Sequence, residues 1–365
     1  MKKIAYIELD THSEIAANFM ELMNDSREFS VDYYFSEKIL KTLGLNETEN
    51  IKKTSPEALF CQLSTNDYQL IIIGTVHRYF NLFNEISRKF NTSVIVHNLN
   101  FTTISRFQLF KNIFKKDFKY RLKLLLKEGL LSATEVYKNA KNLLVLDESL
   151  VQKNSDFTLK FLPVFFKNEY SPNRKSIVTI VIPGTVSQAR RDYWYVLEKI
   201  KSFKRKTHFR FVFLGKADGK ELSWLKEFEK NKLENISIQY FTEKVPQQIF
   251  DEWMQKADIL WCPIQNETEF FSQKEYYGKT KMSGNIGDAI KYGKLAIFPE
   301  NYSNSHPFII PESKDLEEQI FTYQKLMNYD FEENFAREKV LKNLEEKLLT
   351  LLQNLKILPK NFLLT

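Results

Sequence analysis

The sequence has few cysteines and no long hydrophobic run. Its two cysteines, Cys61 and Cys262, lie far apart in apolar surroundings, so we expect buried free thiols rather than a disulfide. No run of about 18 apolar residues is present, which predicts that no helix spans a membrane. The opening MKKIAYIELD holds only a short apolar stretch before Glu8, so we expect no signal peptide. Together these absences predict a cytoplasmic protein.

Several motifs that carry chemistry are also absent. The sequence contains neither a GxGxxG dinucleotide fingerprint nor a GxxxxGK[ST] phosphate loop. No HExxH or CxxC occurs, and no two histidines have the spacing of metal ligands, so we predict no metal site. A GxSxG nucleophile elbow is missing too.

The first half of the chain alternates short apolar strands with helical segments. We predict strands at 3–9, 31–36, 68–76, 92–100 and 141–149, with a helix at 13–25. The third of these strands is apolar at consecutive positions, as in parallel sheets that are buried on both faces. This alternation predicts a doubly wound α/β domain.

The alternation restarts after 161–176, a segment with two prolines that we interpret as a linker. We predict strands at 177–184, 209–217, 236–241, 258–264 and 294–299, and helices at 191–203, 221–232 and 246–257. The fold class is therefore α/β, with two doubly wound domains facing a cleft, at 1–168 and 169–340. The 365 residues fit two domains of ordinary size.

Ligands of such sheets bind beyond the carboxyl ends of the strands. One polar loop follows the strand 177–184 and another follows 209–217; their candidate residues for a diphosphate are Gly184, Thr185, Arg190, Arg191 and Lys216. Arginines beside free main-chain N–H groups suit a diphosphate. The alternative is that both arginines are solvated at a helix end.

Glycine is scarce, with ten in the whole chain, yet four of them lie between Tyr277 and Pro299. We predict that a ligand approaches the backbone closely here, at the start of a helix whose N–H groups face a phosphate. The candidate residues are Lys279, Lys281, Ser283, Gly284, Gly287, Asn285 and Asp288, the last as an acceptor for sugar hydroxyls. A glycine-punctuated turn is the alternative.

Three polar residues follow strands of the first half. His97 comes after an apolar strand and is either a hydrogen-bonded structural residue or a contact to a sugar. Asp10 and His12 follow the first strand, and with His97 they are candidates for a general base. His77 also follows a strand, but a functional role is less well supported for this residue.

A basic segment between Phe101 and Leu130 carries eight lysines and arginines against two acidic residues, within a chain of net charge +7. Phenylalanines and leucines are interleaved at helical spacing. The segment fits the surface of an anionic membrane, or helices with a solvated basic face, better than it fits nucleic acid.

The second half resembles the donor-binding domain of GT-B glycosyltransferases, especially the glycosyltransferase group 1 (family 4-like) enzymes. The resemblance rests on KADILWCPI (256–264) and GDAIKYGKLAIFP (287–299), which match in order and spacing. It implies two Rossmann-like domains and a C-terminal helix, expected at 341–365, that returns to the first domain. It also implies a UDP- or GDP-linked sugar as donor, with no cofactor and no required metal.

The resemblance also implies roles for single residues. Asp288 takes the place of the second glutamate of the family's Glu-x7-Glu motif, which binds the nucleotide ribose. The first glutamate would fall at Thr280, and Glu275 replaces it only if the loop is shifted. Val245 matches the region that packs on the base, and His97 in VHN resembles a histidine that contacts the donor sugar.

These observations predict a glycosyltransferase that transfers a sugar from a nucleotide sugar to a glycan or lipid-linked glycan in surface polysaccharide synthesis. Arg191 and Lys281 would stabilise the charge that develops on the leaving phosphate. A nucleotide-sugar epimerase of the same fold and a non-catalytic partner of a glycan-synthesis complex are the alternatives. We expect the protein on the inner face of the membrane.

Overall fold

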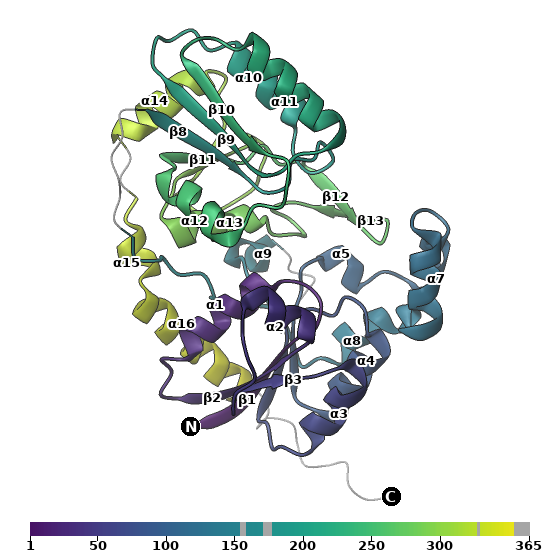
Figure 1. The fold of residues 1–365 in the computed structure, drawn as a ribbon. Coiled ribbons are helices and arrows are strands. Elements are labelled where there is room, and N and C mark those ends of the chain that lie inside the picture. Colours follow the sequence, from purple (N-terminus) through teal and green to yellow (C-terminus); the bar gives the residue numbers. More distant parts are fainter. Residues whose placement is uncertain (154–157, 171–176, 327–328, 354–365) are drawn as a thin grey trace, which may run out of the picture. The chain divides into compact units, whose positions relative to one another are not determined.

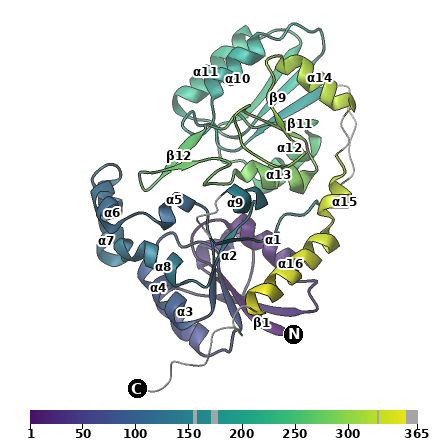
Figure 2. The same ribbon diagram turned by 180° about the vertical axis from the view of Figure 1, so that it is seen from behind.

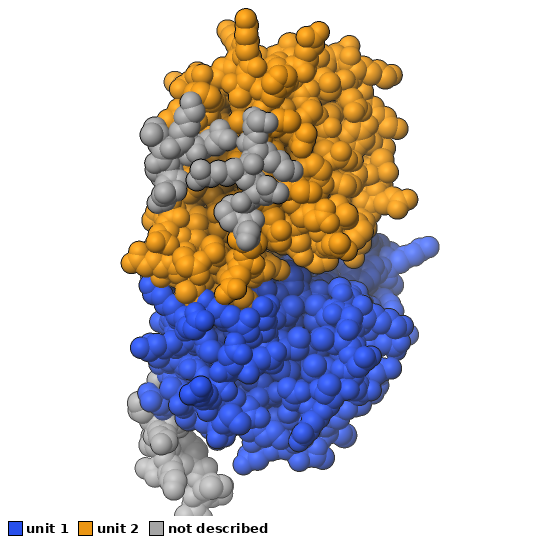
Figure 3. All heavy atoms as spheres, turned by 60° about the vertical axis from the view of Figure 1, so that its left-hand side comes forward, with its two compact units in different colours: residues 1–164, 269–275, 337–365 blue, residues 165–268, 276–336 orange. Residues whose placement is uncertain are grey.

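The computed structural model of the protein describes residues 1–153, 158–170, 177–326 and 329–353. The chain forms two compact units, which are coloured separately in Figure 3: unit 1 comprises residues 1–164, 269–275 and 337–365, and unit 2 comprises 165–268 and 276–336. Part of the expected linker (171–176) and the end of the expected last helix (354–365) lie outside the described residues.

Unit 1 is built on a seven-stranded parallel sheet in the order β3-β2-β1-β4-β5-β6-β7. The strands are β1 (Lys2–Glu8), β2 (Phe29–Phe35), β3 (Ile51–Lys53), β4 (Leu70–Ile73), β5 (Thr92–Ile95), β6 (Asn142–Val145) and β7 (Leu159–Phe161). Successive residues of β1 pack on opposite faces: Tyr6 stacks on Phe19, whereas Ile7 joins the core on the other side. This two-sided burial explains the consecutive apolar residues of the central strands.

Helices cover both faces of this sheet (Figures 1 and 2). They are α1 (Ser13–Met23), α2 (Glu37–Leu43), α3 (Pro56–Ser64), α4 (Phe80–Lys89), α5 (Leu99–Thr102), α6 (Arg106–Ile113), α7 (Phe118–Lys127), α8 (Ala133–Asn139), α9 (Glu148–Lys153) and α16 (Arg337–Gln353), with a 3₁₀ turn at Leu130–Ser132. The last helix, α16, lies beside α1: Ser26 donates a hydrogen bond to Glu345 (2.6 Å), and Arg337 pairs with Glu21 (3.2 Å). The prediction that the C-terminal helix returns to the first domain is therefore confirmed.

Unit 2 contains a six-stranded parallel sheet in the order β10-β9-β8-β11-β14-β15. Its strands are β8 (Val178–Pro183), β9 (Phe209–Lys216), β10 (Ile236–Phe241), β11 (Ile259–Trp261), β14 (Ala296–Phe298) and β15 (Ile309–Pro311). The strand order reverses between β8 and β11, which makes these two neighbours the topological switch point of a doubly wound sheet.

Two apolar clusters fill the two faces of the unit 2 sheet. The helices of this unit are α10 (Tyr193–Lys201), α11 (Gly219–Asn231), α12 (Gln247–Lys256), α13 (Gly284–Tyr292), α14 (Leu316–Leu326) and α15 (Phe331–Phe335). Helices α10, α11 and α14 contribute to one cluster, and α12 and α13 to the other. The predicted α/β class, with two doubly wound sheets, is confirmed.

A two-stranded hairpin, β12 (Glu267–Phe270) and β13 (Gln273–Tyr276), follows β11. Its turn residues Phe271 and Ser272 both have positive φ values, 50° and 55°, as a type I′ turn requires. The Phe271 side chain is buried in the unit 1 core against Phe80 and Phe101. This burial makes 269–275 a part of unit 1.

All ten predicted strands are present, whereas the five strands that sequence reasoning missed are only three or four residues long. Three of them, β3, β7 and β15, are edge strands of three residues each, which are too short to show a clear pattern in the sequence. The described part of the expected linker is not a solvated tether, because Leu162, Val164 and Phe166 are buried. Among the described residues, no helix is both long enough and apolar enough to cross a bilayer.

Candidate nucleotide-sugar site

The two loops that leave the switch point of unit 2 are hydrogen-bonded to each other. Asp192 N–H donates to the Pro263 carbonyl (2.9 Å), and Gln265 N–H donates to the Arg190 carbonyl (2.9 Å). Val186 N–H donates to the carbonyl of Lys216 at the end of the neighbouring strand β9 (3.0 Å). The loop from Gly184 to Arg191 is therefore held by both neighbouring strand ends, as a preorganised ligand loop requires.

Gly184 makes room for Arg191 in this loop. Its φ of 106° is strained for any residue with a side chain, and a Cβ built there would lie 2.4 Å from Nη2 of Arg191. Gly215 serves the same loop, because a Cβ there would lie 2.2 Å from the Gly184 carbonyl oxygen. Gly184 therefore accommodates an arginine of the same chain, and its role in donor binding stays a prediction.

Three predicted residues form a continuous polar chain. Arg191 Nη2 donates to Asn285 Oδ1 (3.0 Å), and Asn285 Nδ2 donates to Asp288 Oδ2 (3.0 Å). Asn285 is buried, whereas Arg191 and Asp288 are half-buried. The Nε atom of Arg191 is buried without a hydrogen-bond partner among the described residues. A planar cation with an unused donor beside a carboxylate is suited to a ligand that carries both phosphate and hydroxyl groups.

Helix α13 begins at this polar chain. Ser283 caps its N-terminus by accepting a hydrogen bond from Asn285 N–H (3.4 Å). A Cβ at Gly284 would meet nothing within 4 Å, so space is open in front of the first turn. Main-chain N–H groups at a helix start favour an anion, and Arg191 adds charge at the same end.

The two helix glycines have different roles. Gly284 is exposed, whereas a Cβ at Gly287 would lie 2.5 Å from the Phe165 ring. The expectation that Gly287 admits a ligand is therefore wrong, because the Phe165 ring already occupies that space.

We expect Gly287→Ala to lower the free energy of unfolding by about 1–3 kcal/mol, because the ring must move to admit the new methyl group. Gly284→Ala is the matched control and should change stability by less than about 1 kcal/mol, and in the stabilising direction. Urea unfolding of the two variants measures both effects. Equal losses would contradict the packing role of Gly287.

Most of the remaining predicted donor residues lie at the surface of unit 2. Thr185, Arg190, Lys216 and Lys279 are exposed, and Lys281 is half-buried. Lys216 forms an ion pair with Asp218 (3.1 Å), and Thr280 Oγ1 accepts a hydrogen bond from Tyr276 N–H (2.8 Å). Val245 is half-buried against the cluster on the α12–α13 face.

Glu275 belongs to unit 1, on strand β13. Its carboxylate is buried and accepts hydrogen bonds from the N–H groups of Asn100 (3.2 Å) and Phe101 (2.9 Å), at the start of α5. Thus Glu275 binds the first turn of a helix in its own unit. These bonds give Glu275 a structural role in unit 1. That role is different from replacing the first glutamate of the family motif.

Unit 1 has its own polar group at the carboxyl ends of β1 and β4. Asp10 contacts Lys38 (2.9 Å), Arg78 (3.3 Å) and His77 (3.5 Å). Burial opposes ionisation of Asp10, but His77, Lys38 and Arg78 outweigh it and lower its pKa far below the usual range. A carboxylate with so low a pKa is a weak proton acceptor, so Asp10 is less suited to the role of general base than a histidine.

His12 and His97 are stacked, with ring centroids 3.9 Å apart and planes 12° from parallel. His97 Nε2 lies 2.9 Å from the Gly74 carbonyl oxygen. A carbonyl can only accept, so Nε2 carries the proton in this bond and Nδ1 is the accepting nitrogen of the neutral ring. The structure brings these two candidates together.

Glu8 holds the loop that contains Asp10. It was not identified from the sequence as a site residue, although a carboxylate inside an apolar strand is an unusual feature that could have pointed to it. Its side chain accepts hydrogen bonds from the N–H groups of Asp10 and Thr11 (both 3.2 Å) and from the Thr75 hydroxyl (2.7 Å). Burial raises the pKa of Glu8 to about 7, even though these hydrogen bonds act in the opposite direction.

We expect Glu8 to make the protein less stable as the pH rises from about 5 to about 8. A carboxyl whose pKa is higher in the folded state binds more protons there, so the free energy of unfolding falls as the pH rises between the unfolded and folded pKa values. The free energy of unfolding should fall by an amount on the order of 2–3 kcal/mol across this window, and Glu8→Gln should abolish this fall. Urea unfolding at both ends of the window tests this, and equal pH slopes would contradict it.

Comparisons with known proteins show which fold the chain has. No protein-family model and no curated protein sequence matches the chain. Solved structures do: the pneumococcal O-GlcNAc transferase GtfA in complex with UDP and GlcNAc has a TM-score of 0.57 at 10% identity, over 96% of this chain and 99% of that chain. Anabaena HepE in complex with UDP and glucose has a TM-score of 0.56 at 11% identity, over 96% and 100%.

The lipopolysaccharide outer core galactosyltransferase WaaB matches with a TM-score of 0.54 at 11% identity, over 95% of this chain and 99% of that chain. Our chain has the GT-B fold. The resemblance seen in the sequence is confirmed at the level of the fold, because the matches cover both units.

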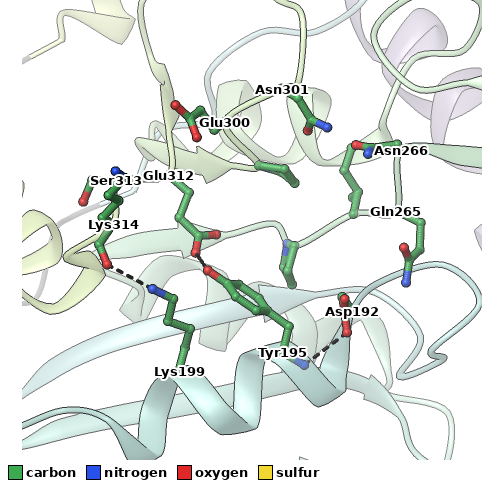
Figure 4. A pocket seen from close by; sticks show the side chains of 13 residues that line it. Asp192, Tyr195, Lys199, Gln265, Asn266, Glu300, Asn301, Glu312, Ser313 and Lys314 are labelled. Atoms are coloured by element: carbon green, nitrogen blue, oxygen red, sulfur yellow. Dashed lines mark hydrogen bonds between the residues drawn. The ribbon is translucent and has the colours of Figure 1, made fainter.

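The GT-B fold of this chain also carries a cavity of about 340 Å³ in unit 2 (Figure 4). Residues of α10 and of the segments after β11, β14 and β15 line it, and Tyr195 donates a hydrogen bond to Glu312 across it (2.5 Å). Its charged side chains are three carboxylates, Asp192, Glu300 and Glu312, and two lysines. This balance disfavours a diphosphate, so the Arg191–Asn285–Asp288 chain remains the better candidate.

Among the described residues, no group of three or more histidine, cysteine, aspartate or glutamate side chains could hold a metal ion.

Proposed function

We propose that the chain is a glycosyltransferase whose unit 2 binds a nucleotide-sugar donor. The observation that carries this proposal is the polar chain from Arg191 through Asn285 to Asp288, which lies at the switch point and at the start of α13. Two of the matched GT-B proteins were solved with UDP and a hexose or an N-acetylhexosamine. Because both of these complexes contain UDP, we propose UDP rather than GDP as the leaving group.

Each residue then has a role that follows from its chemistry. Arg191 and the N–H groups of α13 hold the diphosphate and stabilise its charge as the glycosidic bond breaks. Arg190, Lys216 and Lys281 add positive charge around it, and Asp288 accepts hydrogen bonds from the ribose hydroxyls. Charge stabilisation by these groups is the reason for proposing transfer without a required metal.

Unit 1 contains the residues that we propose to act on the acceptor. We propose His97 or His12 as the general base that accepts a proton from an acceptor hydroxyl if the enzyme inverts configuration; their stacked rings support treating them as one group. We propose a glycan or lipid-linked glycan as acceptor, in surface polysaccharide synthesis at the cytoplasmic face of the membrane. The basic segment 101–130 would be the part of the chain that contacts the membrane.

The experiment that tests this function is incubation with a panel of UDP- and GDP-linked hexoses, followed by analysis of the nucleotide and sugar products. Release of free nucleoside diphosphate with transfer or slow hydrolysis of the sugar supports a transferase. A nucleotide sugar of changed configuration and no released nucleotide would establish the epimerase instead.

The non-catalytic alternative makes a different prediction in the cell. If Asp288→Ala and Lys281→Ala leave glycan assembly intact, while deletion of the protein abolishes it, the chain acts as a partner of other enzymes. Loss of assembly in the variants, with normal protein abundance, supports catalysis.

A further inference from the structure

The helices α6 and α7 carry an unusual concentration of exposed apolar side chains. Eleven large hydrophobic residues of the described chain are exposed, and six of them lie between residues 107 and 126. We call these six the α6–α7 apolar face; they are Phe107 (67% exposed), Phe110 (45%), Phe114 (62%), Phe118 (46%), Tyr120 (38%) and Leu126 (75%). Figures 1 and 2 draw these helices at the margin of unit 1.

Three of these side chains form a connected surface. Phe114 contacts Phe110 on one side (ring centroids 5.5 Å) and Phe118 on the other (5.6 Å), which joins the two helices across the turn between them. An exposed patch of this kind on a globular protein marks an interaction site rather than ordinary surface.

The opposite side of the two helices is firmly attached to unit 1. Arg121 is buried, donates hydrogen bonds to the Asn112 carbonyl and to Ser272 Oγ (2.9 Å), and lies over the Phe271 ring. Asn112 Nδ2 donates to the Phe271 carbonyl (2.8 Å). The apolar face is therefore presented on fixed helices, and its exposure follows from how they are anchored.

Positive charge is concentrated in the same segment, where Arg106 and Lys116 form ion pairs with Glu135 (3.6 Å) and Glu269 (2.8 Å). Of the eight basic residues in this segment, only Arg121 is buried; the seven exposed ones are Arg106, Lys111, Lys115, Lys116, Lys119, Lys123 and Lys127. Lys111 lies over the Phe107 ring, 4.4 Å from its centroid. Lysine stems of this kind run along apolar surface while their ammonium groups reach out to a polar layer.

We propose that the α6–α7 apolar face docks on an anionic lipid bilayer, with its aromatic side chains at the headgroup boundary and its lysines on the lipid phosphates. Two observations favour lipid over nucleic acid. Leu126, the most exposed member of the face, has no ring on which a base could stack. Six of the seven exposed cations are lysines, whereas planar bidentate recognition of phosphate favours arginine.

This inference goes beyond sugar transfer, because docking is measured without any nucleotide sugar. Failure to bind lipid would leave the proposed transfer standing, and failure to bind nucleotide would leave docking standing.

The test is co-sedimentation of the full chain with vesicles of phosphatidylcholine alone or mixed with phosphatidylglycerol. We expect binding to the anionic vesicles only, weakened by added salt. Phe114→Ser/Phe118→Ser should lower the partition coefficient at least tenfold. Lys115→Gln/Lys119→Gln should lower it by about twenty-five-fold, since each lysine near a charged bilayer contributes roughly fivefold.

Matched controls come from unit 2. Lys226→Gln/Lys230→Gln removes the same charge from exposed positions of α11, and Leu233→Ser removes an apolar side chain that is 44% exposed. Both should bind vesicles like the unchanged protein, and all variants should keep its melting temperature.

Three results would overturn the proposal. The first is equal binding to neutral and anionic vesicles, or to neither. The second is tighter binding of a single-stranded or duplex oligonucleotide than of anionic vesicles. The third is a dimer that Phe114→Ser/Phe118→Ser converts to a monomer while vesicle binding stays unchanged.

Discussion

Arg191→Gln is expected to lower kcat/KM for sugar transfer about 10²- to 10³-fold. The guanidinium group is held in the Gly184–Arg191 loop by its bond to Asn285, and its Nε lies buried without a partner among the described residues. Glutamine keeps a polar contact at this position but removes the positive charge. The loss should fall mainly on kcat, because charge on the leaving diphosphate develops as the glycosidic bond breaks.

The controls for this variant separate charge from geometry. Arg191→Lys keeps the charge and loses the planar fork, so we expect an intermediate loss. Lys226→Gln, which removes an exposed charge from α11, should leave kcat/KM unchanged. Full activity of Arg191→Gln with an unchanged melting temperature would remove Arg191 from the mechanism.

The second large effect is expected at Asp288. Asp288→Asn should weaken binding of UDP by about 10- to 100-fold, because hydrogen bonds to a charged acceptor contribute about 1.5–3 kcal/mol. Asp288→Glu restores the longer carboxylate that the resembling family has at this place, and we expect it to retain most of the affinity. Calorimetric titration of the three proteins with UDP measures the differences.

Deoxynucleotides identify the partner of Asp288. If its carboxylate binds the ribose, then 2′- or 3′-deoxy-UDP should bind the unchanged protein more weakly than UDP but bind Asp288→Asn almost as well as UDP does. Such non-additivity shows that the two changes remove one interaction. Independent, additive losses would assign Asp288 to some other part of the site.

The fold was predictable because its signals are strong. Central parallel strands such as β4 and β8 are buried on both faces, and their uninterrupted apolar runs are visible in the sequence. The hairpin β12–β13 gave no such signal. Its two turn residues, Phe271 and Ser272, have positive φ although neither is a glycine. Phe271 completes a core formed by residues more than 130 positions earlier in the chain.

The site was predictable in part for the same kind of reason. Strand ends pointed to Gly184 and Arg191 as candidates, because topology alone brings the carboxyl ends of neighbouring strands together. Asp288 was a candidate because of the glycine-rich stretch and the family resemblance. Pairwise contacts were not predictable: no sequence pattern shows that Gly287 faces Phe165, that Glu275 binds the start of α5, or that Lys38 reaches Asp10. Such contacts depend on distances between elements that tertiary packing sets.

The most direct test of the central claim is calorimetric titration of the full chain with UDP and with GDP. The account predicts one nucleotide bound per chain, with tighter binding of UDP and an affinity that falls in Asp288→Asn but not in Lys226→Gln. A folded chain that releases no binding heat and gains no thermal stability with either nucleotide would contradict the claim that unit 2 is a nucleotide-sugar site.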